Sequence, residues 1–318
     1  MTADSEKMDL SRRIIRSTID WSGVNLLLAD YLAGRFTYRS REEWCSRIVS
    51  GEITLNGKIV SPDTVLALHD QIEYRPQDIP EPPADLDYKI VFEDEELLII
   101  NKPGNLCMHP AGPFFKHTLW HLLCTKYGNI HFINRLDRET SGLLMAAKDP
   151  KTAKTFAKCV SVKRYQVIVH GDFPQEVTAE GFLVDANSVV HKKRKFVFEM
   201  PPAPPFESAK TVFRKISAAN GLSLVEATLF TGRMHQIRAT LSSLGYPVAG
   251  DKLYGLDETF YLKQRTGELS DIDRKTLLVP RQALHSAELE FTHPRTGEKL
   301  SFSSELPAEL QKLLTFGE

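Results

Sequence analysis

The sequence has few cysteines and no long apolar run. Its 318 residues include 4 cysteines, at positions 45, 107, 124 and 159, and no two of them form a C-x-x-C pair. This spacing offers neither a zinc site nor a redox dithiol and is typical of thiols in a reducing compartment. No apolar run approaches the roughly 20 residues that span a bilayer, and the N-terminus has no apolar signal core. We therefore expect a cytoplasmic protein with no membrane partner.

An excess of charge of either sign is also missing. The chain has 40 lysines and arginines against 41 aspartates and glutamates, a formal net charge of −1. Any attraction to nucleic acid must therefore come from a local basic element. Residues 151–215 hold 12 basic and 6 acidic side chains and include the basic run 191–195. Such a run is more often a solvated surface than a binding site.

Four common catalytic motifs are absent, namely GxxxxGK[ST], GxGxxG, HExxH and GxSxG. Their absence argues against nucleotide hydrolysis, dinucleotide redox chemistry, zinc proteolysis and elbow-type serine esterases. His117 and His121 lie four residues apart and could share one helix face, but no third ligand stands near them. We predict neither a metal nor a cofactor.

The composition predicts two domains joined by a linker. The chain is 42% hydrophobic and 25% charged, which is sufficient for a buried core, and its length suggests roughly two domains. Prolines crowd residues 79–87, where they remove amide donors and favour extended backbone. We predict one domain over residues 1–78, a linker over 79–87 and a second domain over 88–318.

The first domain is expected to contain two helices followed by strands. Ser40 and Glu43 form a capping box that starts the second helix, and Asn56-Gly57 is a strong hairpin signal within residues 53–60. A further strand is expected at 71–74. Apolar residues at helical spacing define the first helix at Val24, Leu27, Leu28, Tyr31 and Leu32, and the apolar face of the second at Trp44, Ile48 and Val49.

The second helix is basic, with Arg35, Arg39, Arg41 and Arg47 on it or just before it. A solvated helix face would explain these arginines. However, the run SREEWCSRIVSGEITLNGKIVSPDTVLALHDQIEY resembles the S-four-type RNA-binding domain, in which a basic helix and the following turn contact the RNA backbone. His69 departs from that pattern, which usually has Gly there.

The second domain alternates many strands with few helices. Strands are expected at 88–92, 97–100, 167–169 and 222–230, with an acidic hairpin at 93–96. Asp149 and Pro150 begin a helix that we expect to run to Cys159. This order predicts an α+β fold built on a large, mostly antiparallel mixed sheet.

Two polar clusters in this domain could carry chemistry. In the loop 134–142, Asp137 stands between Arg135 and Arg138, whose charges would lower its pKa; a salt-bridged turn is the alternative. Arg238 lies at the margin of the apolar face of a helix over 234–241, and a partly buried arginine needs an anionic partner. We expect Asp137 to be that partner.

The same clusters carry a family resemblance. NRLDRETSGLLMAAK resembles the HRLDxxTSGLLxxAK signature of the RluA-type pseudouridine synthases, and GRMHQIRATLSSLGYPVAGDKLYG resembles their second long motif. NKPGNLCMHP, KRYQVIVHG and LHSAELEFTHPRTGE follow in the family's order. The resemblance implies an enzyme that isomerises uridine in RNA to pseudouridine without a cofactor.

The resemblance also implies roles for four residues. Asp137 matches the catalytic aspartate, and Arg135 matches the arginine that helps to displace the target nucleotide. Tyr165 matches the tyrosine that stacks on the flipped base. Arg238 matches the arginine that pairs with the catalytic carboxylate. The sequence departs from the family at Asn134, Thr240, Tyr246 and Ser286.

Two other functions remain open at this stage. A protein that binds RNA or assists ribosome assembly without catalysis would suit the first domain and Asn134. A nucleoside or glycoside hydrolase could use Asp137, but most such enzymes need a second carboxylate. Among RNA partners, the S-four-type domain favours ribosomal RNA of the large subunit over tRNA, and we expect a monomer.

Overall fold

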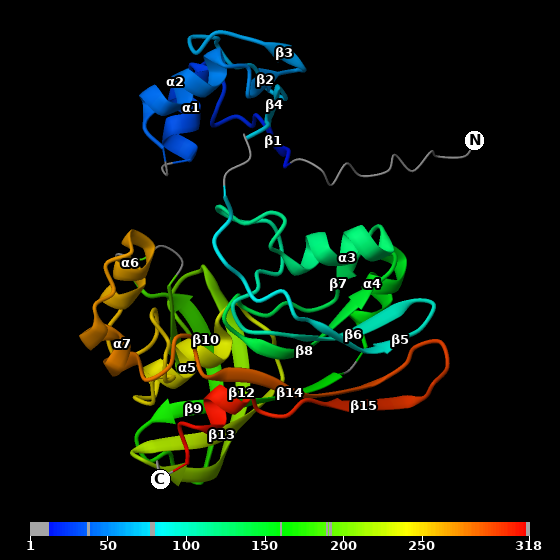
Figure 1. Cartoon of the computed structure of the whole chain (residues 1–318), viewed down its shortest axis with the longest axis vertical. Coiled ribbons are helices and arrows are strands. Elements are labelled where there is room, and N and C mark those ends of the chain that lie inside the picture. Colours follow the sequence, from blue (N-terminus) through cyan, green and yellow to red (C-terminus); the bar gives the residue numbers. More distant parts are fainter. Residues whose placement is uncertain are drawn as a thin grey trace. The chain divides into compact units, whose positions relative to one another are not determined.

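The chain forms two compact units, Met1–Pro82 and Pro83–Glu318 (Figure 1). The computed structural model describes residues 13–36, 39–76, 80–159, 161–188, 190 and 193–315. Residues 1–12 and 77–79, which belong to the expected first domain and linker, lie outside the described residues. No helix in these ranges is long and apolar enough to cross a membrane.

The first unit is a small four-stranded sheet with two helices. Its elements are β1 (Ile15–Thr18), α1 (Leu28–Arg35), α2 (Arg41–Val49), β2 (Ile53–Leu55), β3 (Lys58–Ile59) and β4 (Gln71–Tyr74). The strands are antiparallel in the order β1-β4-β2-β3. Strand β1 was not predicted from the sequence, because this short strand is held by its backbone pairing with β4 and buries no side chain fully.

The capping box of α2 is confirmed. The Ser40 hydroxyl accepts a hydrogen bond from the Glu43 amide, and the Glu43 carboxylate accepts one from the Ser40 amide at 2.8 Å. Trp44 and Ile48 are buried as expected, but Val49 is 72% exposed. The assignment of Val49 to the apolar face was wrong, because five residues along a helix turn its side chain about 140° away from Trp44.

Two turns of this unit use the left-handed backbone region. Asn56 and Gly57 have φ angles of 51° and 75°, which confirms the hairpin. His69, where the family usually has Gly, also adopts a positive φ of 69°. Asp70 holds this turn, since its carboxylate accepts hydrogen bonds from the Ala67 amide and the Asn56 side chain, both at 2.8 Å. The substitution therefore keeps the turn and strains one residue.

The second unit contains an 11-stranded mixed sheet with helices, which confirms the α+β fold class. The elements, in chain order, are β5 (Lys89–Glu93), β6 (Leu97–Lys102), α3 (Leu119–Tyr127), β7 (His131–Phe132), β8 (Ser141–Ala147), α4 (Pro150–Phe156), β9 (Ser161–His170), β10 (Glu176–Asp185), β11 (Arg194–Val197), β12 (Phe206–Ala219), β13 (Leu222–Leu229), α5 (Gln236–Ser243), α6 (Thr259–Thr266), α7 (Asp271–Leu277), β14 (Leu284–Thr292), β15 (Lys299–Ser303) and α8 (Ala308–Gln311).

The strands of this sheet follow the order β11-β10-β12-β13-β9-β14-β8-β6-β5, with β15 beside β14 and β7 beside β8. Only the β14–β8 pair is parallel among the described strand pairs.

Helix α4 begins as expected and ends earlier. The Asp149 carboxylate caps it by accepting bonds from the Lys151 and Thr152 amides. It ends at Phe156, three residues before Cys159, because the Lys158 and Cys159 amides bond three residues back instead of four. Phe156 is buried and fixes this last turn against the core.

The two halves of the sheet carry different helices and meet at its centre (Figure 1). Helix α4 packs against β7 and β8, whereas α5 packs against β10 and β11. Strand β14 approaches β8 so closely that a Cβ atom on Gly142 would lie 2.2 Å from the Ser286 carbonyl oxygen. This contact places the loop before β8 beside the central strands β9 and β14.

Candidate active site

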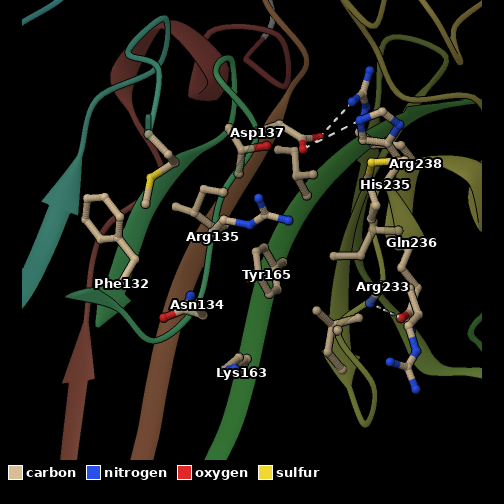
Figure 2. A pocket seen from close by; sticks show the side chains of 18 of the residues that line it. Phe132, Asn134, Arg135, Asp137, Lys163, Tyr165, Arg233, His235, Gln236 and Arg238 are labelled. Carbon is tan, nitrogen blue, oxygen red and sulfur yellow. Dashed lines mark hydrogen bonds and ion pairs between the residues drawn. The ribbon is translucent and has the colours of Figure 1, made fainter. Parts of the chain in front are cut away.

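A cavity of about 950 Å³ opens where the loop before β8, strand β9 and the loop between β13 and α5 converge (Figure 2). Its lining is strongly cationic. Asp137 is the single carboxylate among the described lining residues, whereas the cations are Arg135, Arg138, Lys158, Lys163, Arg233 and Arg238. The positive charge of this lining attracts an anionic ligand. Asp137 is the one carboxylate of the described lining that such a ligand would meet.

Asp137 is bound through one of its two carboxylate oxygens. Its Oδ2 accepts a hydrogen bond from Arg238 Nη1 at 2.7 Å and a longer one from Gln282 Nε2 at 3.4 Å. Its Oδ1 lies 3.8 Å from His235 Nε2 and has no hydrogen bond to any described residue. About 30% of the side chain is exposed to the cavity. Oδ1 is therefore the oxygen that a ligand can reach.

Asp137 is ionised at neutral pH. Burial acts to raise its pKa, but the charge of Arg238, together with His235 and Gln282, holds the pKa below the ordinary value of 3.8. The neighbouring His235 has a pKa lowered by burial from 6.5. His235 is therefore neutral above that value, and its Nδ1 lies 3.0 Å from the Tyr254 hydroxyl.

The flanking arginines are not among the main causes of the low pKa of Asp137. Arg138 pairs instead with Glu139 at 3.2 Å. Arg135 is exposed, and Figure 2 shows its side chain between Asp137 and Tyr165. The charge that stabilises the carboxylate comes from Arg238, 101 residues away.

Arg238 pairs with Asp137 as expected, but Asp251 is its second and more extensive partner. Arg238 Nε and Nη2 donate to the two oxygens of Asp251 at 2.6 and 2.8 Å. Asp251 is fully buried and also accepts bonds from the Leu253 and Tyr254 amides, both at 2.9 Å. Burial alone would lower the pKa of Arg238, but the two carboxylates raise it. This role of Asp251 was not predicted from the sequence, where Asp251 lies within the second long motif.

The loop that carries Asp137 is fastened from several sides. Lys252 Nζ donates to both oxygens of Glu139 at 3.0 Å, and Arg281 Nη1 donates to the Glu139 carbonyl oxygen at 3.0 Å. Gln282 Nε2 bonds the Thr140 hydroxyl at 2.5 Å. These contacts fix the loop before any ligand arrives.

A buried lysine supports the same loop. Lys102 Nζ donates to the carbonyl oxygens of Pro103, Leu106 and Arg138 at 2.8, 3.1 and 3.1 Å. Burial, with a smaller contribution from Arg281, lowers its pKa to about 7. In the sequence, Lys102 follows the apolar run 97–100 by two residues, and this position at the end of a buried strand was the only indication of its role.

Tyr165 lies on β9 in the cavity wall (Figure 2). It is 6% exposed, and burial raises the pKa of its hydroxyl to about 12. The structure thus brings all four residues expected from sequence to one place. Asp137, Arg135 and Tyr165 face the cavity, while Arg238 is 8% exposed and holds Asp137 in position.

Three of the four departures from the family pattern make local contacts, whereas the buried Thr240 hydroxyl has no hydrogen-bond partner in the described structure. Asn134 Oδ1 accepts a bond from the Met145 amide at 2.9 Å and so ties the loop to β8. Ser286 Oγ donates to the Leu143 carbonyl oxygen at 2.9 Å. Tyr246 packs on Phe173 with ring centroids 4.7 Å apart, and Thr240 is buried within α5.

The described basic side chains of residues 151–215 are only partly paired. Lys193 pairs with Glu258, and Arg194 pairs with Glu207 at 2.9 Å. His191 and Lys192 of the basic run lie outside the described residues. The cations of this segment that line the cavity are Lys158 and Lys163.

The described residues contain no group of three potential metal ligands. His121, one of the two histidines noted in the sequence, has its ring centroid 5.1 Å from that of Phe115.

Comparisons with known proteins all point to the same family. The profile of the RNA pseudouridylate synthases matches residues 96–243. Ribosomal large subunit pseudouridine synthase D of Zymomonas mobilis is 32% identical over 302 residues, which cover 89% of this chain and 90% of that protein. The mitochondrial tRNA pseudouridine(32) synthase of Saccharomyces cerevisiae is 31% identical over 77% of this chain and 54% of its own length.

The fold agrees with these sequence matches. The solved structure of human RNA Pseudouridylate Synthase Domain Containing 4 superimposes with a TM-score of 0.53 at 25% identity, covering 71% of this chain and 92% of that one. The chain therefore belongs to the RluA-type family of RNA pseudouridine synthases, isomerases that convert uridine in RNA to pseudouridine.

Proposed function

We propose that Asp137 is the catalytic residue of this isomerase and that its substrate is large-subunit ribosomal RNA. One observation carries the catalytic assignment. Asp137 is an ionised carboxylate with one oxygen free of hydrogen bonds to described residues, and the arginines and lysines of the described cavity lining surround it with positive charge.

The reaction needs no co-substrate. It breaks the bond between C1′ of the ribose and N1 of uracil, turns the base and joins C1′ to C5; N1 gains a proton and C5 loses one. Positive charge develops on the sugar as the first bond breaks, and a fixed carboxylate stabilises it. Oδ1 of Asp137 is the atom placed to act, whether by attack on the substrate or by removal of a sugar proton.

The target uridine must leave its stack to reach Asp137. Tyr165, in the cavity wall, offers its ring as a new stacking partner, and stacking of a base on an aromatic ring contributes about 1–3 kcal/mol. Arg135 is exposed beside it and would take the place of the extruded nucleotide. Its family counterpart has this role.

Ribosomal RNA is favoured over tRNA by the relatives. The Zymomonas mobilis protein is named for the large ribosomal subunit and matches over 90% of its length, whereas the yeast tRNA enzyme matches over 54%. The S-four-type resemblance of the first unit also supports an RNA-binding role there. Arg41 and Arg47 of that unit pair with Asp30 and Glu52 at 2.6 and 2.5 Å, so we expect only part of its positive charge to serve RNA.

The test is substitution of Asp137 combined with pseudouridine mapping. Asp137→Asn should lower turnover at least about 10²-fold while RNA binding stays nearly unchanged. Asp172→Asn is the matched control, because Asp172 is a surface carboxylate with 82% of its side chain exposed. Mapping on ribosomal RNA and tRNA from cells that lack the protein identifies the substrate class.

Three results would contradict the proposal. Full turnover by Asp137→Asn would exclude the catalytic assignment, and modification confined to tRNA would exclude ribosomal RNA. Release of free uracil in place of pseudouridine would favour the hydrolase alternative. A monomer remains our expectation and is checked by light scattering of the purified chain.

A further inference from the structure

Two large apolar side chains at the rim of the cavity are exposed to solvent. Phe230 is 61% exposed and Met234 is 41% exposed, and both belong to the cavity lining. Both lie in the segment 230–235 that joins β13 to α5. Neither side chain is buried in the core, and together they provide apolar surface at the rim of the cavity that a ligand can contact.

The segment that presents Phe230 is held rigidly. The Phe230 amide donates to the Lys210 carbonyl oxygen at 3.1 Å. Gln236, which is 3% exposed, accepts bonds from the Thr231 hydroxyl and the Arg233 amide, both at 2.9 Å. Gln236 also donates to Lys210 and to Thr211 on β12. A ring on such a fixed segment can receive a partner with little loss of conformational entropy.

One cation lies over this ring, and a second stands on the same segment of the chain. Lys210 Nζ lies 5.7 Å from the centroid of Phe230, although it also pairs with Glu180 at 2.7 Å. Arg233 is exposed, and its guanidinium has no carboxylate partner among the described residues; Figure 2 places it at the opposite side of the cavity from Phe132. An exposed aromatic face with a lysine beside it, on a segment that also carries an exposed arginine, suits an unpaired nucleotide, whose base stacks while its phosphate meets the positive charge.

We propose that Phe230, supported by Met234, stacks on the base of a nucleotide adjacent to the target uridine and thereby helps to select the RNA sequence context. This inference rests on the proposed function. When the uridine leaves the stack, its neighbour loses a stacking partner. Phe230 replaces that partner at the rim while Tyr165 receives the uracil inside.

The experiment is a cycle between protein variants and abasic RNAs. An RNA oligonucleotide that contains the mapped target uridine is compared with versions that carry one abasic nucleotide at each of the two positions on either side. The variants are Phe230→Ala, Phe230→Tyr, which keeps the aromatic face, and Ile216→Ala as control. Ile216 is 51% exposed on β12 and does not line the cavity.

With intact RNA, Phe230→Ala should raise KM about 5- to 150-fold and leave kcat within about twofold. Phe230→Tyr should retain the wild-type KM, and so should Ile216→Ala. With the RNA that lacks the stacked base, the wild-type enzyme should show the raised KM, and Phe230→Ala should add nothing to it.

Two results would overturn the inference while the wild-type enzyme remains active. One is an unchanged KM for Phe230→Ala; the other is a loss of equal size on every abasic RNA. If the wild-type enzyme forms no pseudouridine in any RNA, the proposed function fails and this inference fails with it. Thermal melting of each variant checks that the fold is intact.

Discussion

Replacement of Lys102 by methionine should remove a large pH dependence from the stability of the second unit. Lys102 is fully buried, and its ammonium group bonds three carbonyl oxygens without a carboxylate partner in the described structure. Its pKa falls from the ordinary 10.5 to about 7 in the folded chain. Between these values the unfolded chain binds more protons than the folded one, so stability rises with pH.

The size of the effect follows from the two pKa values. Below pH 7, Lys102 is protonated in both the folded and the unfolded chain, and burial of its charge lowers the free energy of unfolding by the full amount. Above pH 10.5 it is neutral in both, and this cost is absent. Between pH 6 and pH 9 its contribution to the free energy of unfolding should rise by about 2–3 kcal/mol. Lys102→Met lacks this rise, because methionine does not titrate.

The assay is urea denaturation of both proteins at pH 6 and pH 9. Fluorine NMR of fluorotryptophan-labelled protein separates Trp120 of the second unit from Trp21 and Trp44 of the first. The wild-type chain should gain about 2–3 kcal/mol more than Lys102→Met over this interval. Comparing the two proteins cancels the titration of all other groups.

Lys252→Met provides the matched control. Lys252 is also buried, but it pairs with Glu139, so its removal should destabilise the fold already at pH 6 by taking from this half-buried carboxylate one of its two cationic partners. An equal pH response of wild type and Lys102→Met would refute the reasoning, since it would mean that the buried ammonium does not titrate in this interval.

Three further substitutions test other parts of the structure. Asp251→Asn should lower the free energy of unfolding by about 3–5 kcal/mol and also lower kcat, because Arg238 loses the partner that holds it against Asp137. Denaturation measures the first effect and single-turnover kinetics the second, and normal kinetics would contradict the positioning role of Asp251. Asn134→Ala should cost about 1 kcal/mol by depriving the Met145 amide of its acceptor, and an unchanged denaturation midpoint would argue against this contact. His69→Gly should stabilise the first unit by up to about 1 kcal/mol, since His69 has a φ of 69°; a lower melting temperature would show that the His69 side chain contributes more than the strain costs.

Several local elements could be predicted because neighbouring residues determine them. The Ser40–Glu43 capping box and the Asn56-Gly57 hairpin depend on side chains within a few positions of the backbone they bond. Strand β1 was missed because the pairing of this strand depends on a distant partner. Val49 was misassigned although helix geometry by itself turns its side chain away from Trp44.

Some residues of the active site were likewise predicted from the sequence, and others were not. The need of Arg238 for an anionic partner was visible from the helix pattern, and Asp137 was a correct choice. Asp251 and Gln282 were missed. They lie 13 and 145 residues along the chain from Arg238 and Asp137, the residues they bond. Distance along the chain did not indicate either contact, because the order of the strands decides which loops lie together.

The sequence by itself determined the kind of chemistry in this protein, through an aspartate between arginines, a tyrosine and a helix arginine arranged in five ordered motifs. Only the tertiary structure decided which cation stabilises Asp137. The parallel pairing of β14 with β8 brings Gln282 and the Asp137 loop together, and packing of α5 on β10 and β11 accompanies the placement of Arg238 between Asp137 and Asp251. The physical reason is that a carboxylate is stabilised by the charge nearest in space, and Arg135 and Arg138, its neighbours along the chain, extend into the cavity or toward Glu139.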